Sequence, residues 1–138
     1  MKITIAQMYA AIAALESLAA QKFAPVTSLK IARISNKLIA ERDVADKQRK
    51  AMLDEMGTIK EGGADYDFAT PAIKQAFFDR WAELCKTEIT VHIDKLPFQA
   101  LGDREVTPFE MQGLEPFLLI EEAALLKPEL VKKEEPAQ

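Results

Sequence analysis

The chain contains very few side chains that could carry out covalent chemistry. Its only histidine, His92, lies in a stretch where apolar and polar residues alternate, and its only cysteine, Cys85, has the apolar neighbours Trp81 and Leu84. Nucleophilic catalysis needs a nucleophile beside a base, and the base is usually a histidine. No serine or cysteine stands at a spacing that suggests a pair with His92. We therefore predict that the protein is not an enzyme, that His92 faces solvent and that Cys85 is a small buried apolar residue.

The sequence also lacks the ligand patterns of a metal site. Asp65 and Asp67, two positions apart, match part of a calcium-binding loop, but the further oxygen ligands and the terminal glutamate of such a loop are missing. Cys85 and His92 fall on different predicted elements, without the spacing of a zinc site. Four acidic residues near the C-terminus are explained by a helix start and by surface exposure rather than by acid–base chemistry: Glu110, Glu115, Glu121 and Glu122. We expect no catalytic residue, no metal and no cofactor.

The composition is that of a soluble globular protein. The chain has 138 residues, of which 49% are hydrophobic and 29% charged, and its formal net charge is −4. This length corresponds to one domain, and the acidic balance disfavours general nucleic-acid binding. The first residues lack the apolar region of a signal peptide, and no run approaches the ~18 apolar residues of a membrane span. We expect no membrane partner, one helical domain over residues 1–127 and a disordered charged tail over residues 128–138.

Two helices of unequal length are expected in the first half of the chain. Residues Ile5 to Lys22 carry apolar side chains at helical spacing. Residues Val26 to Met56 contain no glycine or proline, and Pro25 suits the first turn of this second helix. Because the link between them is so short, the two helices must form an antiparallel hairpin.

The length difference predicts an uncovered surface. At ~1.5 Å per residue the longer helix spans on the order of 45 Å and the shorter one about 27 Å. The far half of the longer helix therefore extends beyond its partner. Met52, Leu53 and Met56 lie in this half, so a later helix, another copy or a partner protein must cover them.

A third helix and a small sheet follow. Thr70 and Pro71 form a helix start, and Ile73, Phe77, Trp81 and Leu84 then form an apolar stripe that covers the far half of the long helix. Phe78 falls off this stripe and is expected to be exposed.

Two short segments have the alternation of β-strands. Residues Glu88 to Ile93 alternate between apolar and polar side chains, as residues Lys2 to Ile5 do, and the two segments are expected to pair. Residues Thr58 to Ala69 and Asp94 to Val106 are predicted to be loops. The expected fold class is mainly α with a minor β element: an antiparallel helical hairpin with one long helix, a third packing helix and a short two-stranded sheet.

The C-terminal part contains one more helix start and an apolar segment. Thr107, Pro108 and Glu110 form a capping signature for a helix of one or two turns that stops near Gly113. After Pro116, the segment 117–126 is apolar on most faces. Such a segment is either buried in the core or docked on another chain.

A basic face is also present on the long helix. Lys30, Arg33 and Lys37 share one face at spacings of three and four. They form either a basic groove or a solvated face interleaved with acidic residues, and we favour the solvated face.

The order of several short motifs resembles a known group of proteins. Lys22-Phe23-Ala24-Pro25-Val26 joins two helices, Glu83-Leu84 leads to Glu88-Ile89-Thr90-Val91, and Leu114-Glu115-Pro116-Phe117 comes near the end. This order resembles, across most of residues 1–120, a family of small uncharacterised helical proteins encoded by tailed bacteriophages and prophages. The Ala-rich first helix and the acidic tail after Leu126 depart from it. The resemblance implies phage origin, and it carries over no functional residues.

These observations lead to one main functional expectation and two others. The main expectation is a non-enzymatic phage accessory or virion-associated adaptor protein, located in the host cytoplasm or the virion, that acts by contact with a protein partner or by self-association. The residues expected to bind the partner are Met52, Leu53, Met56, Phe78, Leu118 and Leu125. The alternative is a phage-encoded inhibitor of a host nucleic-acid-handling or defence protein, because an acidic surface suits blocking a basic groove. Nucleic-acid binding through Lys30, Arg33 and Lys37 is the least favoured.

Overall fold

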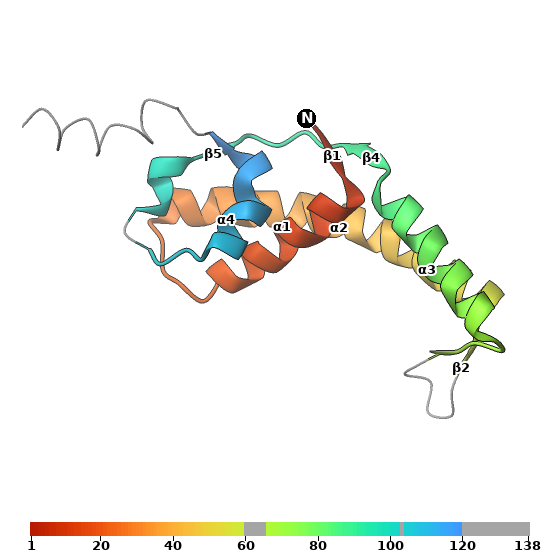
Figure 1. Ribbon diagram of the computed structural model, residues 1–138. Coiled ribbons are helices and arrows are strands. Elements are labelled where there is room, and N and C mark those ends of the chain that lie inside the picture. Colours follow the sequence, from red (N-terminus) through yellow and green to blue (C-terminus); the bar gives the residue numbers. More distant parts are fainter. Residues whose placement is uncertain (60–65, 103, 120–138) are drawn as a thin grey trace, which may run out of the picture.

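The computed structural model describes residues 1–59, 66–102 and 104–119 (Figure 1). Asp65, Leu125 and the predicted tail 128–138 lie outside these residues. The described helices are α1 (Ile5–Leu18), α2 (Pro25–Met56), α3 (Pro71–Cys85) and α4 (Pro108–Leu114), with the short 3-10 helices η1 (Phe98–Leu101) and η2 (Glu115–Phe117). The strands are β1 (Lys2–Thr4), β2 (Thr58–Ile59), β3 (Tyr66–Asp67), β4 (Glu88–Thr90), β5 (Leu96–Pro97) and β6 (Leu118–Leu119). The predicted fold class, mainly α with a minor β element, is confirmed.

Helix α2 is the longest element, and two shorter helices lie along it. It has 32 residues, whereas α1 has 14 and α3 has 15. Helix α1 packs on the first half of α2, and α3 packs on the second half (Figure 1). At ~1.5 Å per residue, α1 and α3 together match most of the length of α2. The predicted hairpin and third packing helix are both confirmed.

A two-stranded sheet joins the end of α3 to the start of α1. Strands β1 and β4 pair in antiparallel register, with Ile3 opposite Ile89. The backbone N–H of Ile5 donates to the Thr87 carbonyl at 3.0 Å, and that of Val91 donates to the Met1 carbonyl at 2.9 Å. The predicted pairing is therefore confirmed, although β4 ends at Thr90 rather than at Ile93.

The predicted helix starts are also confirmed. Thr4 and Thr107 each form a capping box with the residue three positions later, and the Thr70 hydroxyl accepts the Ile73 N–H at 3.2 Å. The predicted end of the first helix is wrong by four residues, since α1 stops at Leu18. The Gln21 N–H donates to the Leu18 carbonyl, and the Gln21 side chain donates to the Glu105 carbonyl at 2.7 Å. These bonds turn the chain out of the helix.

The main core surrounds α1, between α2 and α4. Met8, Leu15 and Leu18 of α1 are buried there with Leu38 of α2. Helix α4 crosses α1 closely, because Gly113 presents no side chain at the contact. A Cβ atom at this position would lie 2.7 Å from the carbonyl oxygen of Ala10. We call this part of the molecule, built on α1, α4 and the first half of α2, the body.

The rest of the structure is a thinner two-helix projection, which we call the arm. It consists of residues 41–56 of α2, the paired strands β2 and β3, and α3 (Figure 1). Phe77 is the one buried residue of α3, and Leu53 is buried near the far end of α2. The arm therefore has far less buried apolar surface than the body.

Two segments predicted as loops contain short paired strands. Within residues 58–69, β2 pairs with β3 in antiparallel register. Within residues 94–106, β5 pairs in parallel with β6, and η1 follows directly. Strands of two residues are too short to produce a visible alternation, which is why the sequence pattern did not indicate them. None of the helices in the described parts of the chain combines the length and apolar character that a membrane span requires.

Candidate protein interface

Two groups of aromatic side chains lie one after the other along the arm. Tyr9 of α1 meets Trp81 of α3 edge to face, with ring centroids 5.9 Å apart. Farther along α3, Phe77 lies 5.5 Å from Phe68 and 5.4 Å from Phe78. We call these five residues the aromatic row. Aromatic pairs at these separations are attractive beyond their buried area, so the row links the body to the far end of the arm.

Arg49 of α2 connects the two halves of the aromatic row. Its guanidinium carbon lies 5.7 Å from the centroid of the Trp81 ring and 6.0 Å from that of the Phe77 ring. A guanidinium group over an aromatic face is held by the electrostatic attraction between the cation and the ring. Arg49 therefore closes the gap between Trp81 and Phe77 and keeps its charge at the surface.

Tyr9 is fixed at the body end of the row by a hydrogen bond to the neighbouring helix. Its hydroxyl donates to Oδ1 of Asp46. Burial and the Asp46 carboxylate both raise the pKa of Tyr9 well above its usual value, because each disfavours a phenolate. The phenol therefore stays protonated and keeps Asp46 engaged.

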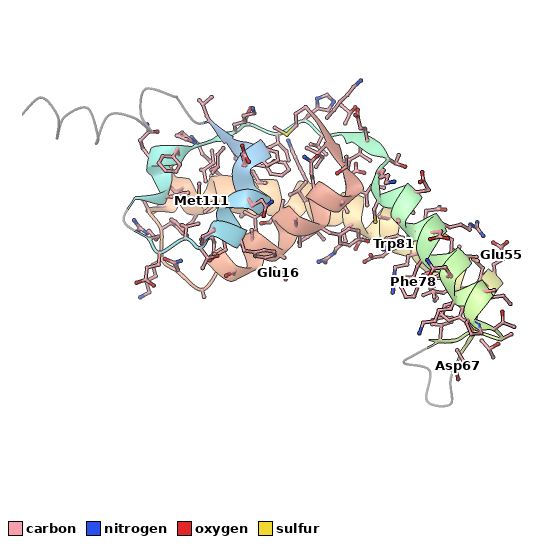
Figure 2. All side chains as sticks on the ribbon, viewed as in Figure 1. Glu16, Glu55, Asp67, Phe78, Trp81 and Met111 are labelled. Carbon is pink, nitrogen blue, oxygen red and sulfur yellow. The ribbon has the colours of Figure 1, made fainter. Side chains whose placement is uncertain are left out.

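Phe78 is the most exposed member of the part of the row on α3. It is 48% exposed, whereas the adjacent Phe77 is 2% exposed. Consecutive residues of a helix point about 100° apart, so Phe77 faces α2 and Phe78 does not. Figure 2 shows Phe78 and Trp81 on the same flank of the arm, away from Glu55. The predicted exposure of Phe78 is therefore confirmed. Its ring lies at the surface, beside the buried ring of Phe77.

The other residues expected to bind a partner do not form one patch with Phe78. Met52 and Met56 are partly buried between α2 and α3, and the Met56 sulfur accepts from Arg80 Nη1 at 3.4 Å. Leu53 is only 7% exposed, and Leu118 is 4% exposed within strand β6. The chain itself buries Leu53 and Leu118, which therefore offer almost no accessible contact surface.

Met52 instead lines an open groove on the α2–α3 pair. The groove has a volume of about 570 Å³ and is formed by Met52 and Gln48 of α2, by the end of α3 and by Thr87. Phe78 does not line it. Arg80, at its edge, forms an ion pair of 3.5 Å with Glu55 across the two helices. Both partners of this pair are exposed, so it contributes little to stability.

The three basic residues of α2 do lie together. Lys30, Arg33 and Lys37 line a small recess of about 80 Å³ with Ile93 and Asp94. The Lys37 ammonium group donates to the carbonyl of His92, which holds the segment after β4 against α2. Asp94 partly compensates the positive charge, so the recess is not a purely cationic surface.

A second open recess lies on the body. It has a volume of about 480 Å³, between Ala6 and Ala10 of α1 and Phe109 and Gln112 of α4. Phe109 is exposed at its rim. No charged or aromatic side chain on the α1 side faces Phe109 across this recess, so it offers fewer specific contacts than the aromatic row.

The side chains considered for chemistry are not brought together. His92 is exposed, as expected, although it lies just after β4 rather than within it. Cys85 is partly rather than fully buried, and burial raises the pKa of its thiol, which disfavours the reactive thiolate. Within the described residues, no group of three or more histidine, cysteine, aspartate or glutamate side chains is placed to hold a metal ion.

Sequence reasoning missed Arg49, Tyr9 and Phe68 as members of this site. A signal for Arg49 was present, since it lies four residues after Ala45 and four before Leu53, both buried on the same face of α2. Phe68 follows a hairpin whose geometry no local pattern indicated. Comparison of the chain with protein-family models, with curated proteins and with solved structures finds no match.

Proposed function

We propose that the protein is a non-enzymatic adaptor that acts by protein–protein contact, with the arm as its binding element. The single observation that supports this most is Phe78, a half-exposed aromatic side chain that packs against the buried Phe77 of the aromatic row. Large exposed aromatic residues backed by well-packed neighbours are typical of the residues that dominate binding energy at interfaces. Arg49, Trp81 and Tyr9, which lie beyond Phe77 along the row, belong to the residue types enriched in such positions.

The shape of the arm supports the same proposal. Its two helices bury few side chains, and one flank exposes a ring that could be buried by a partner. Full burial of an aromatic side chain stabilises a structure by roughly 1.5–3 kcal/mol. The arm alone does not gain this free energy at Phe78, but a complex with a partner could. In the body, by contrast, α1 already packs between α2 and α4, so the arm is the better candidate for a binding element.

The resemblance to small proteins of tailed bacteriophages and prophages suggests the setting of this contact. In that setting the adaptor works in the virion or in the host cytoplasm, and its partner is another protein or a second copy. The structure of the arm does not distinguish the virion from the host cytoplasm. The experiments below therefore test the protein–protein contact first and the location of the complex second.

The test compares two charge-introducing variants of α3, Phe78→Asp and Ala76→Asp. Both positions are exposed, and helical geometry places them about 160° apart around the helix axis. Light scattering on the purified full chain first measures self-association. If the wild-type chain self-associates, Phe78→Asp is expected to give monomers and Ala76→Asp is expected to leave the assembly intact.

If the wild-type chain is monomeric, a photo-crosslinking amino acid is placed at position 78 or at position 76 of the full chain in producing cells. Crosslinks to one protein species from position 78, but not from position 76, would support the proposal. Equal crosslinking from the two positions, with no self-association, would show that this flank of the arm is not an interface. Mass analysis of purified particles then tells whether the complex is part of the virion.

A further inference from the structure

The aromatic row contains a cation whose hydrogen-bonding capacity is not used. Arg49 forms no ion pair and no hydrogen bond with any of the described residues, although its guanidinium group is stacked on Trp81 and Phe77. The nearest acidic residue along α2, Asp46, is engaged by the Tyr9 hydroxyl. The stacked guanidinium is therefore held in place with its N–H donors available to a partner.

Stacking prepares this group for one kind of ligand. A guanidinium group is planar, always charged and able to donate two parallel N–H bonds to a carboxylate. Its contacts with two rings restrict its orientation before binding, so less conformational entropy is lost when the bonds form. A lysine at the same position would keep the charge but would lose both the planar fork and the stacking.

We infer that the partner's docking segment carries a carboxylate beside a large apolar side chain, with the carboxylate bound by Arg49 and the apolar side chain packed on Phe78 and Trp81. This inference rests on the proposed role of the arm in protein binding. Charge complementarity supports it further, since Lys74 lies one turn before Phe78 on the same face of α3. A peptide segment with acidic and apolar side chains would complement both the cations and the exposed aromatic rings of this flank.

The surrounding charges favour a peptide carboxylate over a nucleic-acid backbone. Binding to an extended polyphosphate requires several cations in a line, and the affinity then falls steeply with salt. Here Asp46 and Asp54 lie on the same stretch of α2 as Arg49, and the chain has a net charge of −4. One guanidinium group suffices for one carboxylate, whereas a chain of phosphates brings many negative charges, each of which these aspartates would repel.

The first experiment selects ligands without assuming their sequence. A randomised linear peptide library is selected on the immobilised full chain, with the Phe78→Asp variant used to remove peptides that bind elsewhere. Peptides that depend on Phe78 are expected to contain Asp or Glu within one helical turn of Leu, Phe or Trp. Peptides that depend on Phe78 but lack this acidic residue would overturn the inference while the proposed function stands. The absence of any Phe78-dependent peptide would count against both.

The second experiment measures the role of Arg49 directly. Trp81 is the only tryptophan of the chain, so its fluorescence follows binding of a selected peptide at this flank. Replacement of the peptide's acidic residue by its amide, or Arg49→Gln in the protein, is expected to weaken binding by about ten-fold, the loss typical of a charge-assisted hydrogen bond.

The two changes made together are expected to cost little more than either one alone, because they remove the same contact. Arg49→Lys should restore only part of the affinity. Equal affinity for the acidic peptide and its amide would contradict the inference. Tighter binding of a single-stranded oligonucleotide than of any acidic peptide, with a steep salt dependence, would contradict it as well.

Discussion

The guanidinium group of Arg49 lies 5.7 Å from the ring centroid of Trp81, and this contact joins the two helices of the arm. Because Trp81 is the only tryptophan, its fluorescence reports on the arm and on the contact of the arm with Tyr9 of the body, whereas circular dichroism at the helical band reports on all helices. The arm buries less apolar surface than the body, so it should open at a lower free-energy cost. We predict that in a urea titration the fluorescence transition precedes the circular-dichroism transition. Coincident transitions would show that arm and body unfold as one unit.

Adjacent phenylalanines of α3 should respond very differently to the same substitution. Phe77→Ala removes the one buried side chain of α3 and is expected to lower the free energy of unfolding of the arm by about 3 kcal/mol. Phe78→Ala removes an exposed ring and should change it by less than about 0.5 kcal/mol. The fluorescence-monitored urea midpoint of each variant measures the difference. Similar losses for both would mean that Phe78 stabilises the arm rather than serving a partner.

Gly113 marks the closest approach of α4 to α1. In Gly113→Ala the new Cβ atom would lie 2.7 Å from the carbonyl oxygen of Ala10, which is backbone and cannot move alone. Alanine favours a helix by about 1 kcal/mol over glycine, but overpacking of this contact costs about 1–3 kcal/mol. We expect net destabilisation, measured as a lower midpoint of thermal unfolding, whereas Gln112→Ala at the exposed neighbouring position should leave the midpoint almost unchanged. A stabilised Gly113→Ala variant would show that α4 shifts freely on α1.

Glu110 should make the stability of the body depend on acid pH. Its carboxylate accepts the backbone N–H of Thr107 at 3.2 Å, and this bond, with that to the Thr107 hydroxyl, lowers the pKa of Glu110 below the usual 4.5. A carboxyl group with a lowered folded-state pKa stabilises the fold at higher pH, and this contribution is lost as the pH falls through the folded-state value.

The Glu110→Gln variant removes this titration. The difference in unfolding free energy between wild type and Glu110→Gln is expected to be largest near neutral pH and to shrink as the pH falls below about 4.5. Urea titrations of both proteins over this pH range measure the difference. If the difference in unfolding free energy between the two proteins stays constant with pH, ionisation of Glu110 does not contribute to the stability of the fold.

Both tyrosines should resist ionisation in the folded protein. Hydrogen bonds to Asp46 and Asp54 help to raise the pKa values of Tyr9 and Tyr66 above 10.0, because each phenolic O–H donates to a carboxylate and a phenolate could not. Ultraviolet difference spectra at pH 10 should therefore show little phenolate in the native chain and about half ionisation in urea. A raised folded-state pKa adds stability below pH 10 that is lost at higher pH. Native and unfolded chains with equal phenolate absorbance would contradict these hydrogen bonds.

The sequence predicted the elements that depend on local interactions. The starts of α3 and α4 were predictable because Thr70 and Thr107 bond to backbone groups only three residues away, as Thr4 also does at the start of α1. The long helix was predictable because no glycine or proline interrupts it. The pairing of β1 with β4 was predictable because both strands alternate and no stronger alternating segment competes for either.

The composition of the candidate interface was not predictable in the same way. The contacts of Arg49 with Trp81 and Phe77 depend on the rotation of α3 about its own axis and on its register along α2, which no local pattern fixes. Leu118 was expected at a surface because an apolar run does not reveal what covers it, and its parallel pairing with Leu96 became visible only in the fold. The exposure of Phe78 was predicted correctly, because a single residue off a helical stripe needs no tertiary information.

The pairing of Lys2 with Thr90 sets an order in which the molecule can be assembled during synthesis. The first strand leaves the ribosome early, but its partner strand emerges only after the hairpin of α1 and α2 and all of α3 have been made. Contacts between residues so distant along the chain form late and slowly. The nascent hairpin can therefore pack first, and closure of the small sheet is the step that fixes the base of the arm to the body.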